Sequence, residues 1–351
     1  MTRLVDVDPL DPDPRILEDA ARVLRAGGLV AIPTETVYGL AAIATSSSAT
    51  ARIFEAKGRP AGNPLIVHAS DLDHARRYAA TWPITADRLA RRWWPGPLTL
   101  VIPKRDEIPD VVTAGRGSVA LRVPAAAIAR RLIEVCGSPI AAPSANRSMG
   151  VSPTDARHVL EDLDGRVDLI LDAGPCIIGL ESTVIDLTTD PPRLLRPGAI
   201  TLAQLEATLG RRVADATVKS EPDEGKSLAS PGRMSVHYAP RTPTWRAEAG
   251  DSCLIDESPA RWGMLVLGPL ESFVARASAA PCEEIRLGSP DLAARELYRS
   301  LRDLDARGLD DLLIIAPPRT PEWAAVRDRI ERASRPLSER RPRRPVSPLE
   351  A

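Results

Sequence analysis

The chain has 351 residues and a mass of 37.8 kDa, more than one compact core usually holds, so we predict two domains of unequal size. Its 46 basic and 47 acidic side chains give a formal net charge of −1, which argues against a protein that holds nucleic acid through an overall cationic surface. No apolar run approaches the length of a membrane span, and the first residues are acidic, unlike a signal peptide. We therefore expect a cytoplasmic protein with no membrane contact.

The scarce residue types show where a site could lie. Four cysteines and four histidines are scattered without a CxxC pair, so the sequence indicates neither a disulfide framework nor a metal site. Only four lysines and two asparagines occur beside many arginines. A cluster that contains Lys57, Asn63 or Asn146 is therefore more informative than a cluster of arginines alone.

The first helix is predicted from Arg15 to Ala26, because Asp13 can cap it, Pro14 suits its first turn and Gly27 can end it. Strand and helix patterns then follow each other without strict alternation. Further predicted strands include 29–34, 64–68 and the runs LTLVI, SVALRV and STVIDL, and further helices are 50–56, 71–94 with a break near residue 82, 125–136, 153–162 and 202–209. This pattern predicts an α/β domain with a mixed, twisted sheet over residues 1–209.

The rest of the chain predicts a linker, a second domain and a tail. Residues 210–244 are rich in turn formers and charges, which is typical of a linker. Residues 245–335 contain the strand patterns GMLVLG and DLLIIA and helical patterns at 291–306 and 321–333, which predict a smaller, parallel α/β domain. The Arg- and Pro-rich residues 336–351 predict a disordered tail rather than a nucleic-acid-binding arm.

Five polar clusters interrupt the apolar strands of the first domain, each where a strand is predicted to end. They are PTETVYG at 33–39, KGRPAGNP at 57–64, RVP at 122–124, PSAN at 143–146 and LRPG at 195–198. Ligands usually bind at strand ends of open α/β sheets. We therefore expect these clusters to share one pocket.

The residue types in these clusters favour an oligophosphate ligand. The cations are Lys57, Arg59, Arg122 and Arg196, and the neutral donors are Ser144, Asn146, Asn63, Ser118 and Ser152. Arginine forks bind phosphate oxygens in pairs, lysine acts as a point charge, and hydroxyls and amides complete the shell. The alternative, that each arginine pairs with a surface carboxylate, stays open for any single arginine.

The sequence also limits the chemistry. There is no GxxxxGK[ST] loop, and no Ser/His/Asp or Cys/His spacing points to a covalent intermediate. Phosphoryl and nucleotidyl transfer need mainly positioning and charge stabilisation, which this set of residues can supply. Thr34, Thr36, His68 and Ser182 could form a second, smaller polar subsite, with a structural histidine as the alternative for His68.

Seven motifs, in this order and at this spacing, resemble one known family. PTETVYGL, KGRPAGNPLIVH, WWPGPLTLV, VALRVP, APSANRS, GLESTVID and LLRPG look like the YrdC-like domain of threonylcarbamoyl-AMP synthases, over about Leu17 to Leu209. The segments SPGRMSVHYAPRTP, LYRSLRDLD and VRDRIERAS resemble the longer, two-domain form of the family.

The resemblance implies a twisted mixed sheet with a concave, positively charged cavity, followed by a Rossmann-like domain. It implies a nucleotidyltransferase that makes threonylcarbamoyl-AMP, pyrophosphate and water from L-threonine, bicarbonate and ATP, with Mg²⁺ accompanying the nucleotide. Downstream transfer proteins would then use the product to modify the tRNA adenosine next to the anticodon, and direct contact with tRNA is left open.

The resemblance also assigns residues position by position. The nucleotide-binding and catalytic positions correspond to Lys57, Arg59, Asn63, Ser118, Ser144, Asn146, Ser152 and Arg196. The threonine and carbamate subsite corresponds to Thr36, His68, Arg122, Ser182 and the backbone at Ala142. Tyr238 corresponds to a linker residue that closes over ATP. The linker departs from the family pattern at Arg233 and Met234, which follow Gly232.

Three other interpretations remain. The first is a double-stranded RNA or tRNA-binding module without catalysis, which the near-neutral charge disfavours. The second is related carbamoyl-adenylate chemistry for another acceptor, as in larger hydrogenase-maturation proteins, whose additional segments are missing here. The third is a scaffold-only role for residues 245–335, which carry no catalytic motif.

Overall fold

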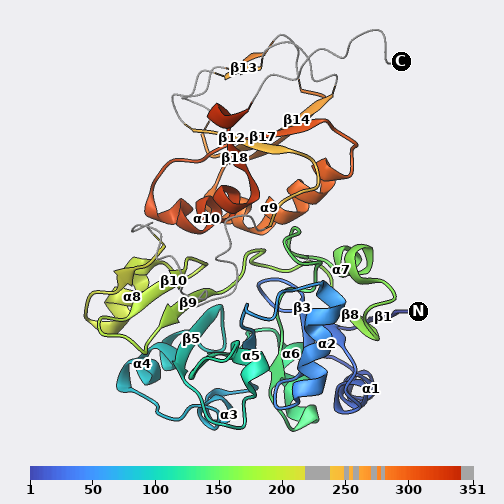
Figure 1. The fold of residues 1–351 in the computed structure, drawn as a ribbon, viewed down its shortest axis with the longest axis vertical. Helices are drawn as coiled ribbons and strands as arrows, with labels where there is room; N and C mark the ends of the chain where they lie inside the picture. The colour runs from blue at the N-terminus through green and yellow to red at the C-terminus, as the bar shows by residue number, and fades with distance from the viewer. Residues whose placement is uncertain (218–237, 249–252, 256–260, 270–274, 278–280, 341–351) are drawn as a thin grey trace. The chain divides into compact units, whose positions relative to one another are not determined.

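The computed structural model describes residues 1–217, 238–248, 253–255, 261–269, 275–277 and 281–340 (Figure 1). The chain divides into two compact units, Met1–Ser235 and Val236–Ala351. Among the described helices, none combines the length and the apolar character that crossing a bilayer requires. Each unit is built around its own sheet.

The first unit contains a mixed sheet in the order β1-β8-β2-β3-β7-β4-β6-β5-β9-β10-β11. Its strands are β1 Arg3–Asp6, β2 Val30–Ile32, β3 Gly39–Ile43, β4 Ile66–His68, β5 Leu98–Pro103, β6 Ser118–Arg122, β7 Ile140–Ala141, β8 Leu169–Asp172, β9 Thr183–Asp186, β10 Arg193–Arg196 and β11 Ala214–Asp215. Parallel pairs such as β4 with β6 alternate with antiparallel pairs such as β5 with β6. The predicted mixed α/β sheet is confirmed.

The helices of this unit lie close to the predicted ranges, except for the helix at 110–113, which was not predicted. They are α1 Pro14–Arg25, α2 Ser47–Lys57, α3 Leu72–Arg76, α4 Ile84–Trp93, α5 Asp110–Thr113, α6 Ala127–Cys136, α7 Ala156–Leu163 and α8 Leu202–Leu209. In α1 the Asp13 side chain accepts from the backbone N–H of Arg15. In α2 the cap is Ser46, and Gly58 ends the helix in the left-handed region at φ +61°. Helix α2 therefore stops at Lys57, the first of the predicted site residues.

The two faces of this sheet carry different side chains. One face packs against α2, α4, α5, α7 and α8 in a continuous apolar core that includes Val67, Leu100 and Leu121. On the other face, α1 and α6 cover β2, β3, β7 and β8. Beside that second core lies a small apolar cluster of Ile66, Val101, Ala120, Val184 and Leu195. This cluster belongs to β4, β5, β6, β9 and β10, and the candidate site is built around it.

The second unit contains a parallel sheet in the order β16-β14-β17-β12-β18 and a separate pair, β13 with β15. Its elements are β12 Thr244–Ala247, β13 Cys253–Ile255, β14 Trp262–Leu267, β15 Ala275–Ala277, β16 Glu283–Leu287, α9 Pro290–Asp305, β17 Asp311–Ile315, the 3-10 turn η1 Pro321–Trp323, α10 Ala324–Ala333, β18 Arg335–Pro336 and the 3-10 turn η2 Leu337–Glu339. The predicted small, parallel α/β layer is confirmed.

Two boundaries differ from the sequence-based expectations. Strand β11 pairs with β10 inside the stretch that we assigned to the linker. The predicted disordered tail is wrong for its first residues, because Pro336 pairs in β18, Leu337 packs on the core of the second unit and Arg340 contacts Asp311 at 3.0 Å. Residues 218–237 and 341–351 of the predicted linker and tail lie outside the described residues.

The core of the first unit can be tested at Leu121. This side chain is completely buried, and Leu121 pairs with Leu100 across β6 and β5. We predict that Leu121→Ala lowers the free energy of unfolding of this unit by about 2–5 kcal/mol, because it removes buried methyl groups and leaves a cavity. Hydrogen exchange of amides in β5 and β6 measures this unit alone. The control Leu10→Ala, at an 83% exposed leucine, should change the same free energy by less than about 0.5 kcal/mol, and an equal effect of both variants would contradict the prediction.

Candidate active site

Strand alternation brings the predicted site residues together on one face of the sheet. In a strand, side chains two residues apart point to the same side. His68 therefore shares the face of Ile66, Arg122 that of Ala120, and both apolar partners belong to the small cluster described above. Thr99 pairs in register with Val184, and Ser182 lies two residues before Val184. His68, Arg122 and Arg196 are the last residues of β4, β6 and β10, which agrees with the strand-end location expected from the sequence.

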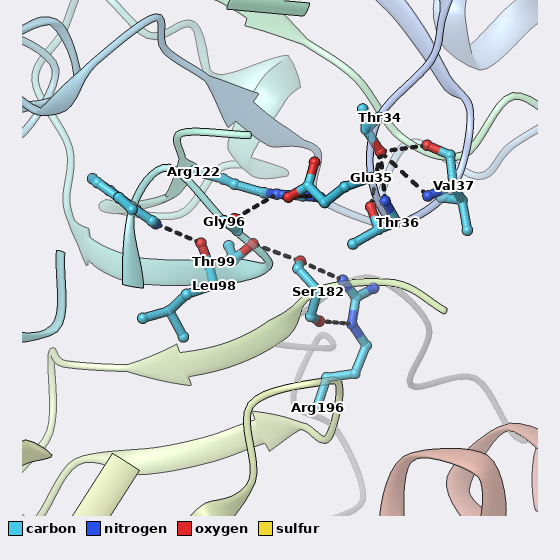
Figure 2. A network of polar contacts seen from close by, with 11 residues as sticks. Thr34, Glu35, Thr36, Val37, Gly96, Leu98, Thr99, Arg122, Ser182 and Arg196 are labelled. Carbon is cyan, nitrogen blue, oxygen red and sulfur yellow. Dashed lines mark hydrogen bonds and ion pairs between the residues drawn. The ribbon is translucent and has the colours of Figure 1, made fainter. Parts of the chain in front are cut away.

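A buried ion pair between Arg122 and Glu35 lies at the centre of this face (Figure 2). The distance from Arg122 Nη2 to Glu35 Oε1 is 2.7 Å, and Arg122 Nε donates to the Gly96 carbonyl at 3.3 Å. The two side chains are 4% and 3% exposed. Burial would raise the pKa of the Glu35 carboxyl, but the charge and hydrogen bond of Arg122 hold this pKa below its usual value. The Glu35 carboxyl is therefore ionised at neutral pH.

The loop that carries Glu35 is held in place by its own threonines. Thr34 Oγ1 donates to the Val37 carbonyl at 2.6 Å and lies 2.9 Å from Thr36 Oγ1. The carbonyls of Glu35 and Thr36 accept from the backbone N–H groups of Ile178 and Gly179. Thr34 therefore shapes the turn, and Thr36 presents its hydroxyl beside the ion pair (Figure 2).

Arg196, at the end of β10, reaches Ser182 in front of β9. Its Nε donates to the Ser182 carbonyl at 3.0 Å, and its Nη2 donates to Ser182 Oγ at 3.1 Å. Ser182 Oγ also lies 2.7 Å from Thr99 Oγ1 on β5. These contacts join three neighbouring strands and place a second guanidinium on the same face as Arg122 (Figure 2).

Lys57 ties the end of α2 to the segment around Asn146. Its Nζ donates to the Ser144 carbonyl at 2.5 Å, to the Asn146 carbonyl, and to Asn146 Oδ1 at 3.3 Å. Ser144 Oγ donates to the same Asn146 Oδ1 at 2.6 Å. Burial and the nearby Arg59 charge hold the pKa of the Lys57 amine well below its usual value. The structure thus brings the buried Lys57 and Asn146 together with the partly buried Ser144.

The loop after α2 adds Arg59 and Asn63. Arg59 Nη2 donates to the Pro64 carbonyl at 3.1 Å, and its Nε lies 3.4 Å from the Asn63 carbonyl. Both side chains are buried, and Asn63 Oδ1 has no hydrogen-bond partner among the described residues. A buried amide oxygen that no protein group satisfies points to a donor supplied from outside the protein.

His68 is a second buried group with an unsatisfied atom. It lies opposite Arg122 in the β4–β6 register, and its Nδ1 has no partner among the described residues. Burial, with the nearby Arg122 charge, lowers the pKa of His68 to about 3, so its ring is neutral at physiological pH. A backbone hydrogen bond with Ile66 opposes this lowering of the pKa, so the alternative of a structural histidine stays open.

The other predicted site residues, Ser152, Ala142 and Ser118, differ in how directly they connect to the residues around Arg122. Ser152 is buried and donates to Glu181 Oε1 at 2.6 Å, next to Ser182. Ala142 is anchored through its N–H on the Ile66 carbonyl. Ser118 begins β6 on the same face as Arg122 but four residues away, and no hydrogen bond joins it to the other site residues in the described part of the chain.

Tyr238 belongs to the second unit. Its ring lies 5.6 Å from the Tyr298 ring, and the Arg329 guanidinium lies 5.4 Å from its centroid. Its backbone has φ +62°, which is unusual for a residue other than glycine. The predicted contact of Tyr238 with ATP stays a prediction, and Gly232, Arg233 and Met234 lie outside the described residues.

Comparisons with known proteins agree along the whole chain. A family model described as "Telomere recombination" matches residues 22–198, and one described as "Threonylcarbamoyl-AMP synthase, C-terminal domain" matches residues 200–335. Threonylcarbamoyl-AMP synthase of Pyrococcus abyssi is 43% identical over 320 residues, which cover 90% of this chain and 93% of that protein. The chain belongs to the threonylcarbamoyl-AMP synthase family.

Other relatives support the two-domain form of threonylcarbamoyl-AMP synthase. The Bacillus subtilis synthase is 40% identical over 92% of this chain and 93% of its own length. The crystal structure of P. abyssi Sua5 complexed with L-threonine gives a TM-score of 0.82 at 38% identity and covers 95% of this chain and 99% of that one. A variant of that protein in which a histidine and the following tyrosine are replaced by alanine also gives 0.82, at 37% identity over 95% of this chain and 98% of that one. These relatives support the synthase interpretation and not the RNA-binding module.

The structure adds residues to the candidate site that sequence reasoning missed. Glu35 lies inside the PTETVYG motif, but an acid did not fit a search for phosphate-binding cations. Thr99 interrupts the apolar run LTLVI, and Glu181 precedes Ser182. A polar residue at an alternate position of an apolar strand is the signal that could have identified Thr99.

The neutral state of His68 can be measured directly. We predict that NMR signals of the His68 ring remain those of a neutral imidazole from about pH 8 down to about pH 5, whereas an ordinary histidine titrates near pH 6.5. A His68→Gln variant identifies the signal among the four histidines. Because the unfolded chain binds this proton near pH 6.5 and the folded chain does not, His68 makes stability fall as the pH decreases below about 6.5. A His68 midpoint near 6.5 in the folded protein would contradict the assignment.

Proposed function

We propose that this chain makes threonylcarbamoyl-AMP and pyrophosphate from L-threonine, bicarbonate and ATP. The observation that carries the proposal is the 43% identity to the P. abyssi synthase over 90% of this chain. The site geometry supports the proposal independently. The guanidinium groups of Arg122 and Arg196 share one sheet face. His68 Nδ1 and Asn63 Oδ1 are buried and have no hydrogen-bond partner among the described residues, so they could bind a ligand.

The threonine end of the site is proposed around Arg122. A guanidinium suits the amino-acid carboxylate, because hydrogen bonds between two ionised groups are short and strong. The Thr36 and Ser182 hydroxyls, the neutral His68 ring and the backbone at Ala142 surround this position and can accept or donate hydrogen bonds. The complex of P. abyssi Sua5 with L-threonine supports an amino-acid subsite in the family.

The ATP end is proposed around Lys57, Arg59 and Arg196. The polar residues that would complete it are Asn63, Ser118, Ser144, Asn146 and Ser152. In the reaction, the threonine amine and bicarbonate form a carbamate with loss of water, and a carbamate oxygen then attacks the α-phosphorus while the bond to pyrophosphate breaks. Negative charge grows on phosphate oxygens, and fixed cations lower the energy of that transition state. Lys57 holds Ser144 and Asn146 in place as well as supplying charge.

Magnesium is proposed to enter as part of the substrate, bound to ATP phosphates. Within the described residues, no three His, Cys, Asp or Glu side chains come together in a way that could hold a metal ion. Mg²⁺ commonly keeps several waters and binds through substrate phosphates rather than in a protein cage. Downstream proteins that transfer the threonylcarbamoyl group to tRNA, and any direct contact with tRNA, belong to the same proposal.

The proposed reaction is tested by mass spectrometry of the full-length protein with ATP, L-threonine, MgCl₂ and ¹³C-labelled bicarbonate. We expect threonylcarbamoyl-AMP that carries the label in its carbamoyl carbon, with an equal amount of pyrophosphate. A parallel titration with tRNA tests the alternative. Salt-sensitive tRNA binding without labelled product would contradict the proposed function and support an RNA-binding module.

The role of Arg196 is tested against a neighbour on the same strand. We predict that Arg196→Ala lowers the turnover number by about 100-fold or more, because it removes a fixed charge beside the reacting phosphate. Arg193, at the exposed start of β10, provides the matched control, and Arg193→Ala should leave turnover within about twofold. Unchanged turnover in Arg196→Ala, with normal folding by circular dichroism, would refute the role assigned to Arg196.

A further inference from the structure

Glu35 is a buried acid in a site that is proposed to bind anions. Its side chain is 3% exposed, its Oε1 accepts from Arg122, and its Oε2 has no hydrogen-bond partner among the described residues. Burying a carboxylate is costly unless it is paired and hydrogen-bonded, and an apolar side chain of similar size would avoid that cost. Packing alone therefore does not explain a charged residue at this position.

The contacts of Arg122 show that the Glu35 charge fixes one of its guanidinium nitrogens. Glu35 holds Nη2, and the Gly96 carbonyl holds Nε from the neighbouring segment. No hydrogen bond of Nη1 is found in the described part of the chain, so two anchors fix the plane of the guanidinium and leave its third nitrogen for another group. Gly96 is needed for its anchor, because a Cβ there would lie 2.3 Å from the Trp93 carbonyl oxygen.

Glu35 is itself rigidly placed. Thr34 closes the turn around it, and the backbone N–H of Ile178 donates to its carbonyl. Arg122 is fixed at the end of β6, whose partners β4 and β5 are both buried. The ion pair thus joins the hydrogen-bonded turn at Glu35 to the buried strand β6.

We propose that Glu35 is a positioning residue for substrate binding: its charge holds the Arg122 guanidinium so that Nη1 faces the carboxylate of the bound amino acid. The inference rests on the proposed function, since it takes Arg122 as the carboxylate-binding group. Glu35 acts through Arg122 and not on the reacting atoms. Its loss therefore affects the affinity for threonine, whereas the ATP end, built on Lys57, Arg59 and Arg196, keeps its contacts.

The experiment is isothermal titration of full-length variants with L-threonine and, separately, with ATP and MgCl₂. For Glu35→Gln, which keeps the shape and removes the charge, we expect the Kd for threonine to rise at least about 10-fold and the Kd for ATP to stay within about twofold. Glu35→Asp keeps the charge but places it one methylene further from Arg122. Its Kd for threonine should lie between the values for Glu35→Gln and wild type. Glu55→Gln, at an exposed acid on α2, is the matched control and should bind both ligands as wild type does.

A double-variant cycle with Arg122→Lys tests whether Glu35 acts through Arg122. If it does, the threonine Kd of the double variant Glu35→Gln with Arg122→Lys should be within about twofold of the Kd of Arg122→Lys alone. Additive losses, or an unchanged threonine Kd in Glu35→Gln, would overturn the proposal. Weakened binding of both ligands together with a lower melting temperature would also overturn it, in favour of a structural role.

Two further results complete the test. If Glu35→Gln does not fold, Glu35→Asp decides, because unchanged threonine affinity in that variant is incompatible with positioning. Failure of the proposed function is recognised separately, because wild-type protein would then give no labelled product in mass spectrometry. Threonine binding that weakens in Glu35→Gln while wild type makes no product would support the positioning of Arg122 and refute only the synthase activity.

Discussion

The alternation of side chains along β4, β5, β6 and β9 organises the whole first unit. Val67, Leu100 and Leu121 enter the large core on one side, while His68, Thr99 and Arg122 emerge on the other. The same backbone hydrogen bonds that stabilise the sheet therefore set the spacing of the polar groups. Because His68, Thr99 and Arg122 lie on neighbouring strands, the pairing of those strands fixes the positions of their backbones relative to one another.

Charge compensation inside the protein decides what each cation can do for a ligand. Arg122 has a full counter-charge in Glu35, so its buried guanidinium is stabilised before any ligand binds. Lys57 is instead surrounded by carbonyl and amide oxygens, which satisfy its N–H groups without neutralising its charge. The two buried cations are thus stabilised differently, Arg122 by a counter-charge and Lys57 by neutral oxygens.

Sequence reasoning identified the elements with strong local signals. Asp13, Ser46 and the glycines that follow α2 and α6 define helix ends through capping and left-handed backbone, and these signals act over a few residues. Strand β3 was missed because GLAAI consists of small residues without alternation. The seven motifs placed the candidate residues in one domain. A motif does not show, however, which residues of two neighbouring strands lie opposite each other. Register decides that His68 lies opposite Arg122 and that Glu35 reaches it, so the shared face and the ion pair became visible only in the structure.

The anchoring of Lys57 has a mechanical consequence for the ATP end of the site. Its Nζ holds the backbone at Ser144 and Asn146, and its carbonyl accepts from the N–H of Ser148. Helix α2 is therefore tied to this segment by side-chain and backbone contacts. Ile53 and Phe54 anchor the same helix in the large core, so a substitution that repacks them would also displace the support of Ser144 and Asn146.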